Sequence, residues 1–342
     1  MSNLAKFFGL SATLALVGCP EGSSGDGGGS TGNTGGINIS GSSSDDGGFT
    51  NLGDSSTTED DNPLGIIDCE HIDFVFVVDN SSSMADEQQH LAAAVPGFVD
   101  AIQTALPDVE TIRVGVVDSD AYPGLGSPDA LADSCPESAD CDSCDYQLGA
   151  LLTRPNSAAD ADASCGFSTD KPFMDGFGAD FTSEFECAAL VGTEGNPVEQ
   201  QASALVAAVS NDLTECNNGF IRDEALLVFL MITDEEDDVA SDPQPQGGSL
   251  GDPAAWTEAV LAAKEGKQSN VVALGLIGGS PRFDDCTDLS QGLDGAEQTT
   301  RLQSFIGSFD NNFTGSVCSE GYDAFFNDAL VEVSEACSLF IP

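Results

Sequence analysis

The fold is decided by residues 73–84, which read Asp-Phe-Val-Phe-Val-Val-Asp-Asn-Ser-Ser-Ser-Met. Between Asp73 and Asp79 lies a short apolar run without alternation, which is typical of a strand buried on both faces. Apolar residues then recur at helical spacing and predict an amphipathic helix, namely at Met84, Leu91, Val95, Phe98 and Ile102. A buried strand that leads directly into a helix indicates the first unit of an α/β fold.

Other segments repeat this pattern. Residues 111–117, 225–233 and 270–277 are rich in branched and large apolar side chains, and helical periods follow at 254–263 and 325–333. The segment 225–233 is very hydrophobic, but it is too short to span a bilayer as a helix. Strands that alternate with helices predict a doubly wound, Rossmann-like α/β fold, in which a mostly parallel sheet is flanked by helices on both faces.

The charge of the chain limits its partners. The 342 residues include 58 Asp and Glu against nine Lys and Arg, which gives a formal net charge of −49. Nucleic acids and anionic membrane surfaces need clustered cations, so both are excluded as direct partners. Only two histidines, His71 and His90, are present, and no Gly-x-Ser-x-Gly segment surrounds Ser81 to Ser83. We therefore expect no enzymatic activity.

The first 19 residues are typical of a lipoprotein signal peptide. Lys6 precedes an apolar run, 7–17, which is too short for a membrane span but suits a signal sequence. The run ends in Leu-Val-Gly-Cys at 16–19, which resembles a bacterial lipobox and implies lipidation of Cys19. An ordinary cleaved signal with a coincidental cysteine is the alternative. We expect an exported protein that is lipid-anchored to the bacterial cell envelope, at the outer membrane or cell surface.

The composition changes twice along the chain. Residues 20–63 consist mainly of Gly, Ser, Thr, Asp and Asn, so they bury too little apolar surface to offset chain entropy, and we expect a disordered tether. The folded domain is then predicted at 64–342. A Cys-rich insertion at about 119–186 is expected to have little regular structure apart from a short hairpin near 146–152, and a helix at 181–190 leads back into the core.

Ten cysteines follow Cys19, and an even number predicts five disulfides in an exported protein. They are Cys69, Cys135, Cys141, Cys144, Cys165, Cys187, Cys216, Cys286, Cys318 and Cys337. A bridge between Cys69 and Cys337 would join the first strand to the last helix, although spacing alone does not fix the pairing. The Cys-x-x-Cys pair at 141 and 144 suggests a zinc site as the alternative, but no histidine lies nearby.

Hydroxyl and carboxylate side chains follow the predicted strands where the strands end. Asp79, Ser81 and Ser83 form a D-x-S-x-S pattern at the first strand-to-helix turn, and Asp234 follows the strand at 225–233. Thr193 lies in a Gly-Thr-Glu-Gly loop that precedes another helical stripe. Because ligands of parallel sheets bind beyond the carboxyl ends of the strands, these oxygen atoms are expected to converge on one cation. All-oxygen donors suit Mg²⁺, or Ca²⁺ or Mn²⁺.

Weaker candidates lie near the same predicted edge. They are Asp237 and Asp238 for a second cation, Asp118 and Asp120 at the end of the second strand, and Thr182 and Thr169 as alternatives to Thr193. The serines also have a simpler interpretation, because a serine hydroxyl before a helix often caps the first backbone N–H groups without any metal.

The D-x-S-x-S pattern, the threonine and the aspartate, in this order, resemble the von Willebrand factor type A (VWA) domain and its metal-ion-dependent adhesion site (MIDAS). The resemblance covers residues 68–340. It implies that Ser81, Ser83 and Thr193 contact the metal directly, that Asp79 and Asp234 act directly or through waters, and that a partner protein supplies a further carboxylate.

Additional features narrow the resemblance. A lipobox, a glycine-rich tether, a Cys-rich insertion and an I-T-D-E-E-D-D strand end are similar to secreted VWA lipoproteins of myxobacteria-like bacteria. Two features depart from the family pattern: Ser82 replaces a common glycine, and the insertion lengthens the spacing between Ser83 and Thr193.

The sequence therefore predicts a membrane-tethered domain that binds or adheres to a protein through a divalent cation. An acidic, calcium-binding structural lipoprotein of the envelope, without a discrete adhesion partner, is the alternative. The dense acidic charge favours loose cation binding, and self-repulsion of that charge is screened by salt.

Overall fold

The structure is a computed structural model that describes residues 69–119, 144, 147–154, 164–193, 195, 199–237, 248–292 and 294–342. The predicted signal peptide with Cys19 and the predicted tether at 20–63 lie outside these residues. So do Cys135, Cys141, Asp120 and Asp238. Within the described part, no helix has both the length and the apolar character needed to cross a membrane.

Six strands form one sheet in the order β3-β2-β1-β4-β5-β8. Neighbouring strands are parallel, except that β3 pairs antiparallel with β2 at one edge. The strands are β1 His71–Val78, β2 Thr111–Asp118, β3 Met174–Asp175, β4 Leu226–Ile232, β5 Val271–Ile277 and β8 Asn311–Ser316. A separate small sheet pairs β6 Thr287–Asp288 with β7 Gly295–Ala296. The predicted mostly parallel α/β fold is confirmed.

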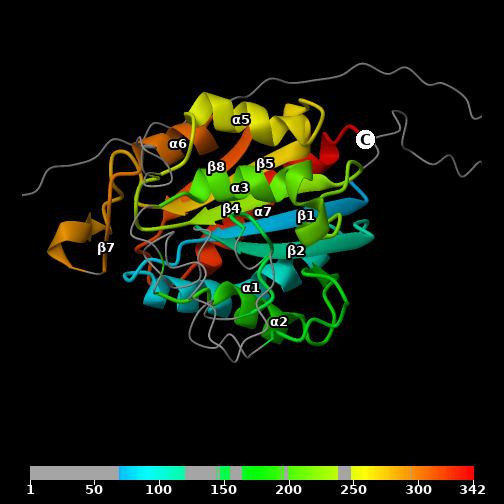
Figure 1. Cartoon of the computed structure of the whole chain (residues 1–342), viewed down its shortest axis with the longest axis horizontal. Coiled ribbons are helices and arrows are strands. Elements are labelled where there is room, and N and C mark those ends of the chain that lie inside the picture. Colours follow the sequence, from blue (N-terminus) through cyan, green and yellow to red (C-terminus); the bar gives the residue numbers. More distant parts are fainter. Residues whose placement is uncertain are drawn as a thin grey trace, which may run out of the picture. The chain divides into compact units, whose positions relative to one another are not determined.

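Helices cover both faces of the large sheet (Figure 1). The longer ones are α1 Ala85–Ala105, α2 Phe181–Ala189, α3 Gln201–Val209, α5 Pro253–Ala262, α6 Thr300–Ile306 and α7 Asp323–Ser338. Short helical turns are η2 Asn211–Leu213, α4 Thr214–Asn217, η3 Gln268–Asn270 and η4 Leu289–Gln291. The alternation of strand and helix along the chain produces this three-layer arrangement.

The apolar core is divided between the two faces of the sheet. Helices α1, α2 and α7 pack with Phe74 and Phe76 of β1, whereas α3, α5 and α6 pack on the other side with Val75 and Val77. Successive side chains of a strand point to opposite faces, so the continuous apolar run of β1 supplies both cores. The central position of β1 follows from this sequence pattern.

At the amino-terminal edge of the sheet, charged residues anchor the strands. The Arg222 guanidinium contacts Asp73 at 2.6 Å, and the Arg222 N–H donates to the same carboxylate at 2.7 Å. Lys264 Nζ donates to the carbonyls of Arg222 and Ala225. Burial raises the pKa of Asp73, although Arg222 opposes the change, and burial lowers the pKa of Lys264. Asp73, Arg222 and Lys264 are thus held in place by contacts with one another and with the backbone, and their role is structural.

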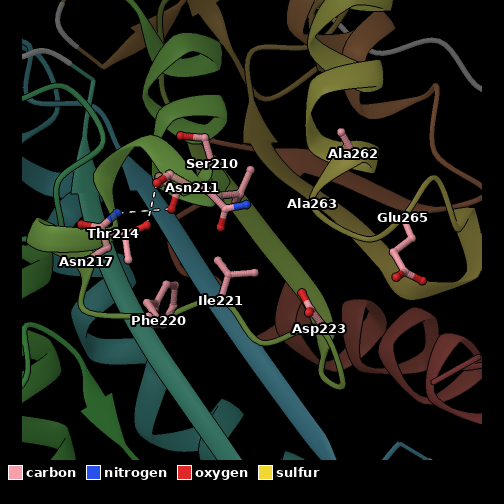
Figure 2. Close-up of a pocket in the computed structure, with 13 residues that line it drawn as sticks. Ser210, Asn211, Thr214, Asn217, Phe220, Ile221, Asp223, Ala262, Ala263 and Glu265 are labelled. Atoms are coloured by element: carbon pink, nitrogen blue, oxygen red, sulfur yellow. Dashed lines mark hydrogen bonds between the residues drawn. The ribbon is translucent and has the colours of Figure 1, made fainter.

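A pocket of about 140 Å³ opens at this same edge, between the ends of α3 and α5 and the start of β4 (Figure 2). Its wall is built by internal hydrogen bonds: Thr214 Oγ1 donates to the Asn211 carbonyl at 2.6 Å, and Asn217 Nδ2 donates to the Ala208 carbonyl at 3.2 Å. The pocket precedes β4, whereas Asp234 follows it. It therefore lies away from the predicted metal ligands.

Four disulfides join described residues: Cys69–Cys337, Cys144–Cys216, Cys165–Cys187 and Cys286–Cys318. The bridge between Cys69 and Cys337 was predicted and is confirmed. Because Cys144 is bonded to Cys216, its sulfur is not available to the zinc site considered as an alternative. Several disulfides fit a protein exported to an oxidising compartment.

The helix predicted at 181–190 is confirmed as α2. The prediction of a hairpin near 146–152 is wrong for the residues described there, 147–152. Residues 147–149 form a turn, and no strand follows it. Instead, the Leu151 N–H donates to Asn217 Oδ1 at 3.0 Å, and the Leu152 N–H donates to the Val116 carbonyl at 2.8 Å. The segment packs against β2 and a neighbouring side chain, so it does not pair with itself.

Candidate functional site

Strands β1 and β4 lie side by side, and the residues that follow them meet at the carboxyl edge of the sheet. The Asp79 N–H donates to the Ile232 carbonyl at 3.0 Å, which continues the ladder by one step. Thr233 Oγ1 then donates to Asp79 Oδ2 at 2.6 Å. Asp79, Thr233 and Asp234 are all fully buried. Two loops distant in sequence are thus joined at the point where the chain order of the sheet reverses.

The serines of the first loop are not used as helix caps. Helix α1 begins after Met84, and its N-terminus has no side-chain capping hydrogen bond. Instead, Ser81 Oγ and Ser83 Oγ lie 3.3 Å apart, and the Ser81 N–H donates to Asp79 Oδ1 at 2.6 Å. Both serines are almost completely buried. The simpler interpretation of the D-x-S-x-S pattern, an N-cap, does not describe this loop.

Asp234 is the electrostatic centre of the cluster. The pKa of Asp234 is raised to about 7, first by burial and then by the charge of Asp79, and the Ser83 hydroxyl partly opposes the change. Among the described residues, no group donates a hydrogen bond of regular geometry to either of its carboxylate oxygens. Burial of a carboxylate without donors of regular geometry is costly, because little in the protein replaces its lost hydration.

The loop that carries Thr193 lies against the first loop. Gly192 is hydrogen-bonded to Gln88 of α1, and the Gly195 N–H donates to the Asn80 carbonyl at 2.9 Å. Gly192 has φ +93°, a conformation that favours glycine. Thr193 itself is half-buried. The Thr193 loop therefore lies against the Asp79 loop, at the edge of the sheet where Asp79 and Asp234 also meet.

The two alternatives to Thr193 are placed differently. Thr182 is exposed on the first turn of α2. Thr169 Oγ1 donates to the Phe173 carbonyl at 3.0 Å within its own loop. Thr193 differs from both, because it directly follows Gly192, and Gln88 hydrogen-bonds both the Gly192 and the Asp79 carbonyls.

Replacing Gly195 with alanine is expected to push the Thr193 loop away from the Asp79 loop. The new Cβ would lie 1.9 Å from Asn80 Oδ1 and 2.8 Å from the Asn80 carbonyl oxygen, so backbone must move. We expect a loss of about 1–3 kcal/mol of unfolding free energy, as for other overpacked sites. Urea denaturation measures it, with Gly178→Ala as the control because a Cβ there meets nothing within 4 Å. Equal losses for both variants would contradict the proposed contact.

The other acidic candidates have their own roles or lie outside the described residues. Asp237 accepts hydrogen bonds from the Ala202 N–H at 2.8 Å and from Ser249 Oγ at 2.7 Å, and it pairs with Arg301 at 3.5 Å. Burial raises the pKa of Asp237 to about 6, and these partners oppose the change. In this arrangement Asp237 holds the start of α3. Asp118 is buried at the end of β2.

Several buried polar side chains around the cluster escaped the sequence analysis. Gln201 Nε2 donates to Thr233 Oγ1 at 3.0 Å, which in turn orients the Thr233 hydroxyl toward Asp79. Glu87 is 3% exposed, and burial raises its pKa to about 8, with the Asp86 and Asp234 charges acting in the same direction. A polar residue at a buried helix position breaks the apolar period, and that break is the only signal the sequence offered.

The sequence matches no protein-family model and none of the curated proteins searched. Two structures of proximal thread matrix protein 1 (PTMP1) from the mussel byssus have a similar fold. The first has 13% identity and a TM-score of 0.40 over 78% of this chain and 49% of that one. The second has 16% identity and a TM-score of 0.34 over 79% and 47%. This chain spans about half the length of those structures, and similarity this low carries no argument about function.

Within the described residues, no cluster of three or more His, Cys, Asp or Glu side chains is arranged to hold a metal ion. The candidate site is of another kind, because it combines two carboxylates with hydroxyl groups. Such hydroxyl and carboxylate oxygens are the donors that hard divalent cations prefer. The buried oxygens of Asp234, which have no hydrogen-bond donor of regular geometry among the described residues, are the feature that a cation would satisfy.

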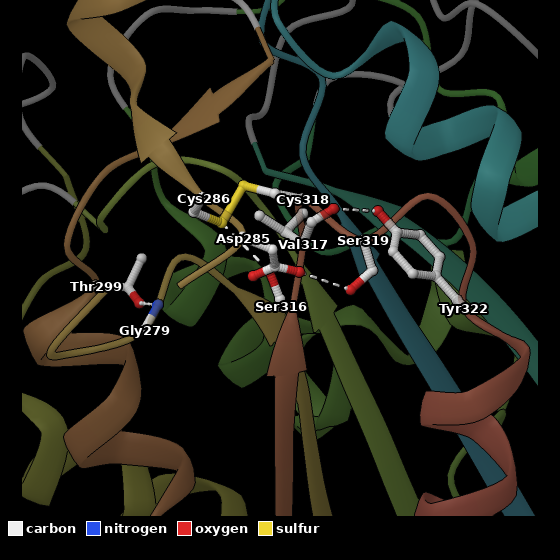
Figure 3. Close-up of a disulfide and its surroundings, with 9 residues drawn as sticks. All are labelled: Gly279, Asp285, Cys286, Thr299, Ser316, Val317, Cys318, Ser319 and Tyr322. Atoms are coloured by element: carbon white, nitrogen blue, oxygen red, sulfur yellow. Dashed lines mark hydrogen bonds between the residues drawn. A yellow bond between two sulfur atoms is a disulfide. The ribbon is translucent and has the colours of Figure 1, made fainter. Parts of the chain in front are cut away.

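The long loop between β5 and α6, residues 278–299, forms the neighbouring part of the edge and is held by a disulfide. Cys286 and Cys318 join the loop after β5 to the loop after β8, and Ser319 Oγ donates to Asp285 Oδ2 at 3.1 Å (Figure 3). The same loop contacts the site at Glu297, whose N–H donates to the Asp234 carbonyl at 2.7 Å. The backbone of Asp234 is therefore fixed on a cross-linked support.

Proposed function

We propose that this domain binds a partner protein through a divalent cation held by Asp79, Ser81, Ser83, Thr193 and Asp234. The observation that carries the proposal is the buried Asp234 carboxylate, which lies beside Asp79 and has no regular hydrogen-bond donor among the described residues. Two buried carboxylates repel each other, and a divalent cation would reverse that repulsion.

The residues at the site fit a hard cation. Ser81 and Ser83 present neighbouring hydroxyls that cap no helix, and Asp79 is oriented by the Thr233 hydroxyl and the Ser81 N–H. Oxygen donors of this kind suit Mg²⁺, or Ca²⁺ or Mn²⁺. When bound, the ion would supply a Lewis-acidic position for an oxygen of the partner. The resemblance to the VWA family and its MIDAS makes a carboxylate of that partner the expected ligand.

The proposed setting is the bacterial cell envelope. Lipidation of Cys19 would anchor the chain, and residues 20–63 would act as the tether that holds the domain away from the lipid. A net charge of −49 argues against nucleic acid as a partner. We place the protein among binding modules and not among enzymes. His71 contacts Thr111 at the start of β1, and His90 packs edge-on against Tyr322.

Calorimetric titration with MgCl₂ and with CaCl₂ tests this proposal. The native domain is expected to bind one ion with measurable heat, and Asp79→Ala is expected to lose that binding because a ligand and its charge are removed. Asp100→Ala is the control, since Asp100 is exposed on α1 away from the cluster. No binding by the native domain, or equal binding by Asp79→Ala, would contradict the proposal.

The alternative is an acidic structural lipoprotein that binds calcium loosely, and the charge of −49 is the observation that favours it. In that case monovalent salt should stabilise the domain as well as calcium does, since either one screens the repulsion among the acidic side chains. Thermal melting in 0.5 M NaCl therefore separates the two functions. Stabilisation by NaCl equal to that by millimolar Mg²⁺ or Ca²⁺ favours the structural role, whereas additional stabilisation by the divalent ion favours the discrete site.

A further inference from the structure

One glutamine of α1 contacts two of the three loops at the candidate site. Gln88 is 2% exposed. Its Nε2 donates to the Asp79 carbonyl at 2.9 Å and to the Gly192 carbonyl at 2.8 Å, and its Oε1 accepts from the Gly192 N–H at 3.2 Å. This side chain thereby links the Asp79 loop, nine residues before it, to the Gly192 loop, 104 residues after it.

The contacts define the orientation of the amide. If the oxygen and nitrogen of the Gln88 side chain were exchanged, an acceptor would face two carbonyl oxygens and a donor would face an N–H group. Only the observed orientation satisfies all three neighbours. Both N–H groups and the oxygen are then used, which is the condition under which a buried amide is retained without a large desolvation cost.

The two loops that Gln88 joins both carry proposed ligands. The Asp79 carbonyl belongs to the first aspartate of the D-x-S-x-S pattern, and Gly192 directly precedes Thr193. At Gly192 the backbone has φ +93°, so the chain turns there and directs the next residue. The main-chain position of Thr193 relative to Asp79 is therefore set by the length of one side chain, in addition to the Gly195–Asn80 hydrogen bond.

We infer that Gln88 is a positioning residue that holds the Thr193 loop and the Asp79 loop at the spacing a small divalent cation requires. The inference rests on the proposed function, because it assigns Gln88 a role toward the ion of that same site. Mg²⁺ demands near-octahedral geometry at short distances, whereas Ca²⁺ accepts longer and more variable ones. Loosening the two loops should therefore weaken Mg²⁺ binding more than Ca²⁺ binding. Gln88 would then tune the choice between the two ions.

The test replaces Gln88 with methionine, which keeps the length of the side chain and removes its hydrogen bonds. Calorimetric titration should show at least a tenfold loss of Mg²⁺ affinity and less than a threefold loss of Ca²⁺ affinity. Gln89→Met is the matched control, since Gln89 is exposed and donates only to Ala85 of its own helix at 2.9 Å. A general loss of folding would lower both affinities together, so the ratio of the two identifies positioning.

A double-mutant cycle asks whether Gln88 acts through Thr193. In the Thr193→Ala background, Gln88→Met should change Mg²⁺ affinity less than threefold, because the ligand that Gln88 positions is already absent. Effects that multiply independently would overturn the inference. If Gln88→Met does not fold, Gln88→Asn serves in its place, since the shorter amide cannot reach both loops.

The two levels of failure are distinct. A native domain that binds neither ion overturns the proposed function and with it the role of Gln88. A native domain that binds Mg²⁺, together with a Gln88→Met variant that binds Mg²⁺ and Ca²⁺ in the native ratio, overturns only the role of Gln88.

Discussion

Replacing both Cys69 and Cys337 with alanine is expected to lower the free energy of unfolding by roughly 5 kcal/mol, according to the chain-entropy description of disulfides. The bridge closes a sequence separation of 268 residues, the longest of the four described bridges. It joins Cys69, two residues before β1, to the last turn of α7, and both half-cystines are buried. Since many domains have only about 5–15 kcal/mol of stability, this loss is severe.

Urea denaturation without reductant measures this effect. The matched control is the double alanine variant of Cys165 and Cys187, whose separation is only 22 residues and whose loss should be about 3 kcal/mol. A loss at Cys69 and Cys337 that is equal to or smaller than the control would contradict the entropic explanation. It would show that strain or residual structure in the unfolded chain dominates instead.

The metal-free protein is expected to become more stable when Asp234 is replaced by asparagine. The pKa of Asp234 is raised from 3.8 to about 7 in the folded state, first by burial and then by Asp79. A carboxyl whose pKa is raised by folding has no effect on the free energy of unfolding below its unfolded pKa. As the pH rises from the unfolded pKa to the folded pKa, it lowers that free energy. At pH 8 the cost for Asp234 is on the order of 4 kcal/mol, and Asp234→Asn should recover most of it.

Denaturation curves between pH 4 and pH 8 in EDTA measure this. The native protein should lose stability as the pH rises from about 4, and the loss in Asp234→Asn should be smaller by the contribution of this one carboxylate. A residual slope is expected in the variant from Glu87 and Asp237, whose pKa values are raised to about 8 and about 6, in both cases chiefly by burial. Added Mg²⁺ should restore the native protein at pH 8 and leave the variant unchanged. Asp100→Asn, on the exposed side of α1, is the control, and parallel slopes for the native protein and Asp234→Asn would contradict the assignment.

The buried strands were predictable because their signal is continuous. The apolar runs at 73–79, 111–117, 225–233 and 270–277 correspond to β1, β2, β4 and β5. The edge strand β8 was missed, since its sequence Asn-Asn-Phe-Thr-Gly-Ser has one large apolar residue and most of its positions are only half-buried. An edge strand has one neighbour and less burial, so its composition carries less information. The two-residue strand β3 is too short for any period.

The residues of the candidate site were predictable as positions at strand ends, but their support was not. D-x-S-x-S and Asp234 follow strands that parallel pairing must bring together. Gln88 and Gln201 act through hydrogen bonds to residues far away in sequence. Both interrupt the apolar period of a helix, unlike the exposed Gln89, but that interruption does not identify their distant partners. Whether the serines cap α1 also depended on backbone geometry that the sequence does not contain.

The covalent link between Cys69 and Cys337 has a mechanical consequence. If the chain is pulled from its two ends, the load enters the domain at Cys69 and leaves it at Cys337, and these two residues are bonded directly. The force then passes through sulfur atoms and bypasses the sheet and its hydrogen bonds. Traction on the chain on either side of this bridge therefore cannot unravel the residues between Cys69 and Cys337.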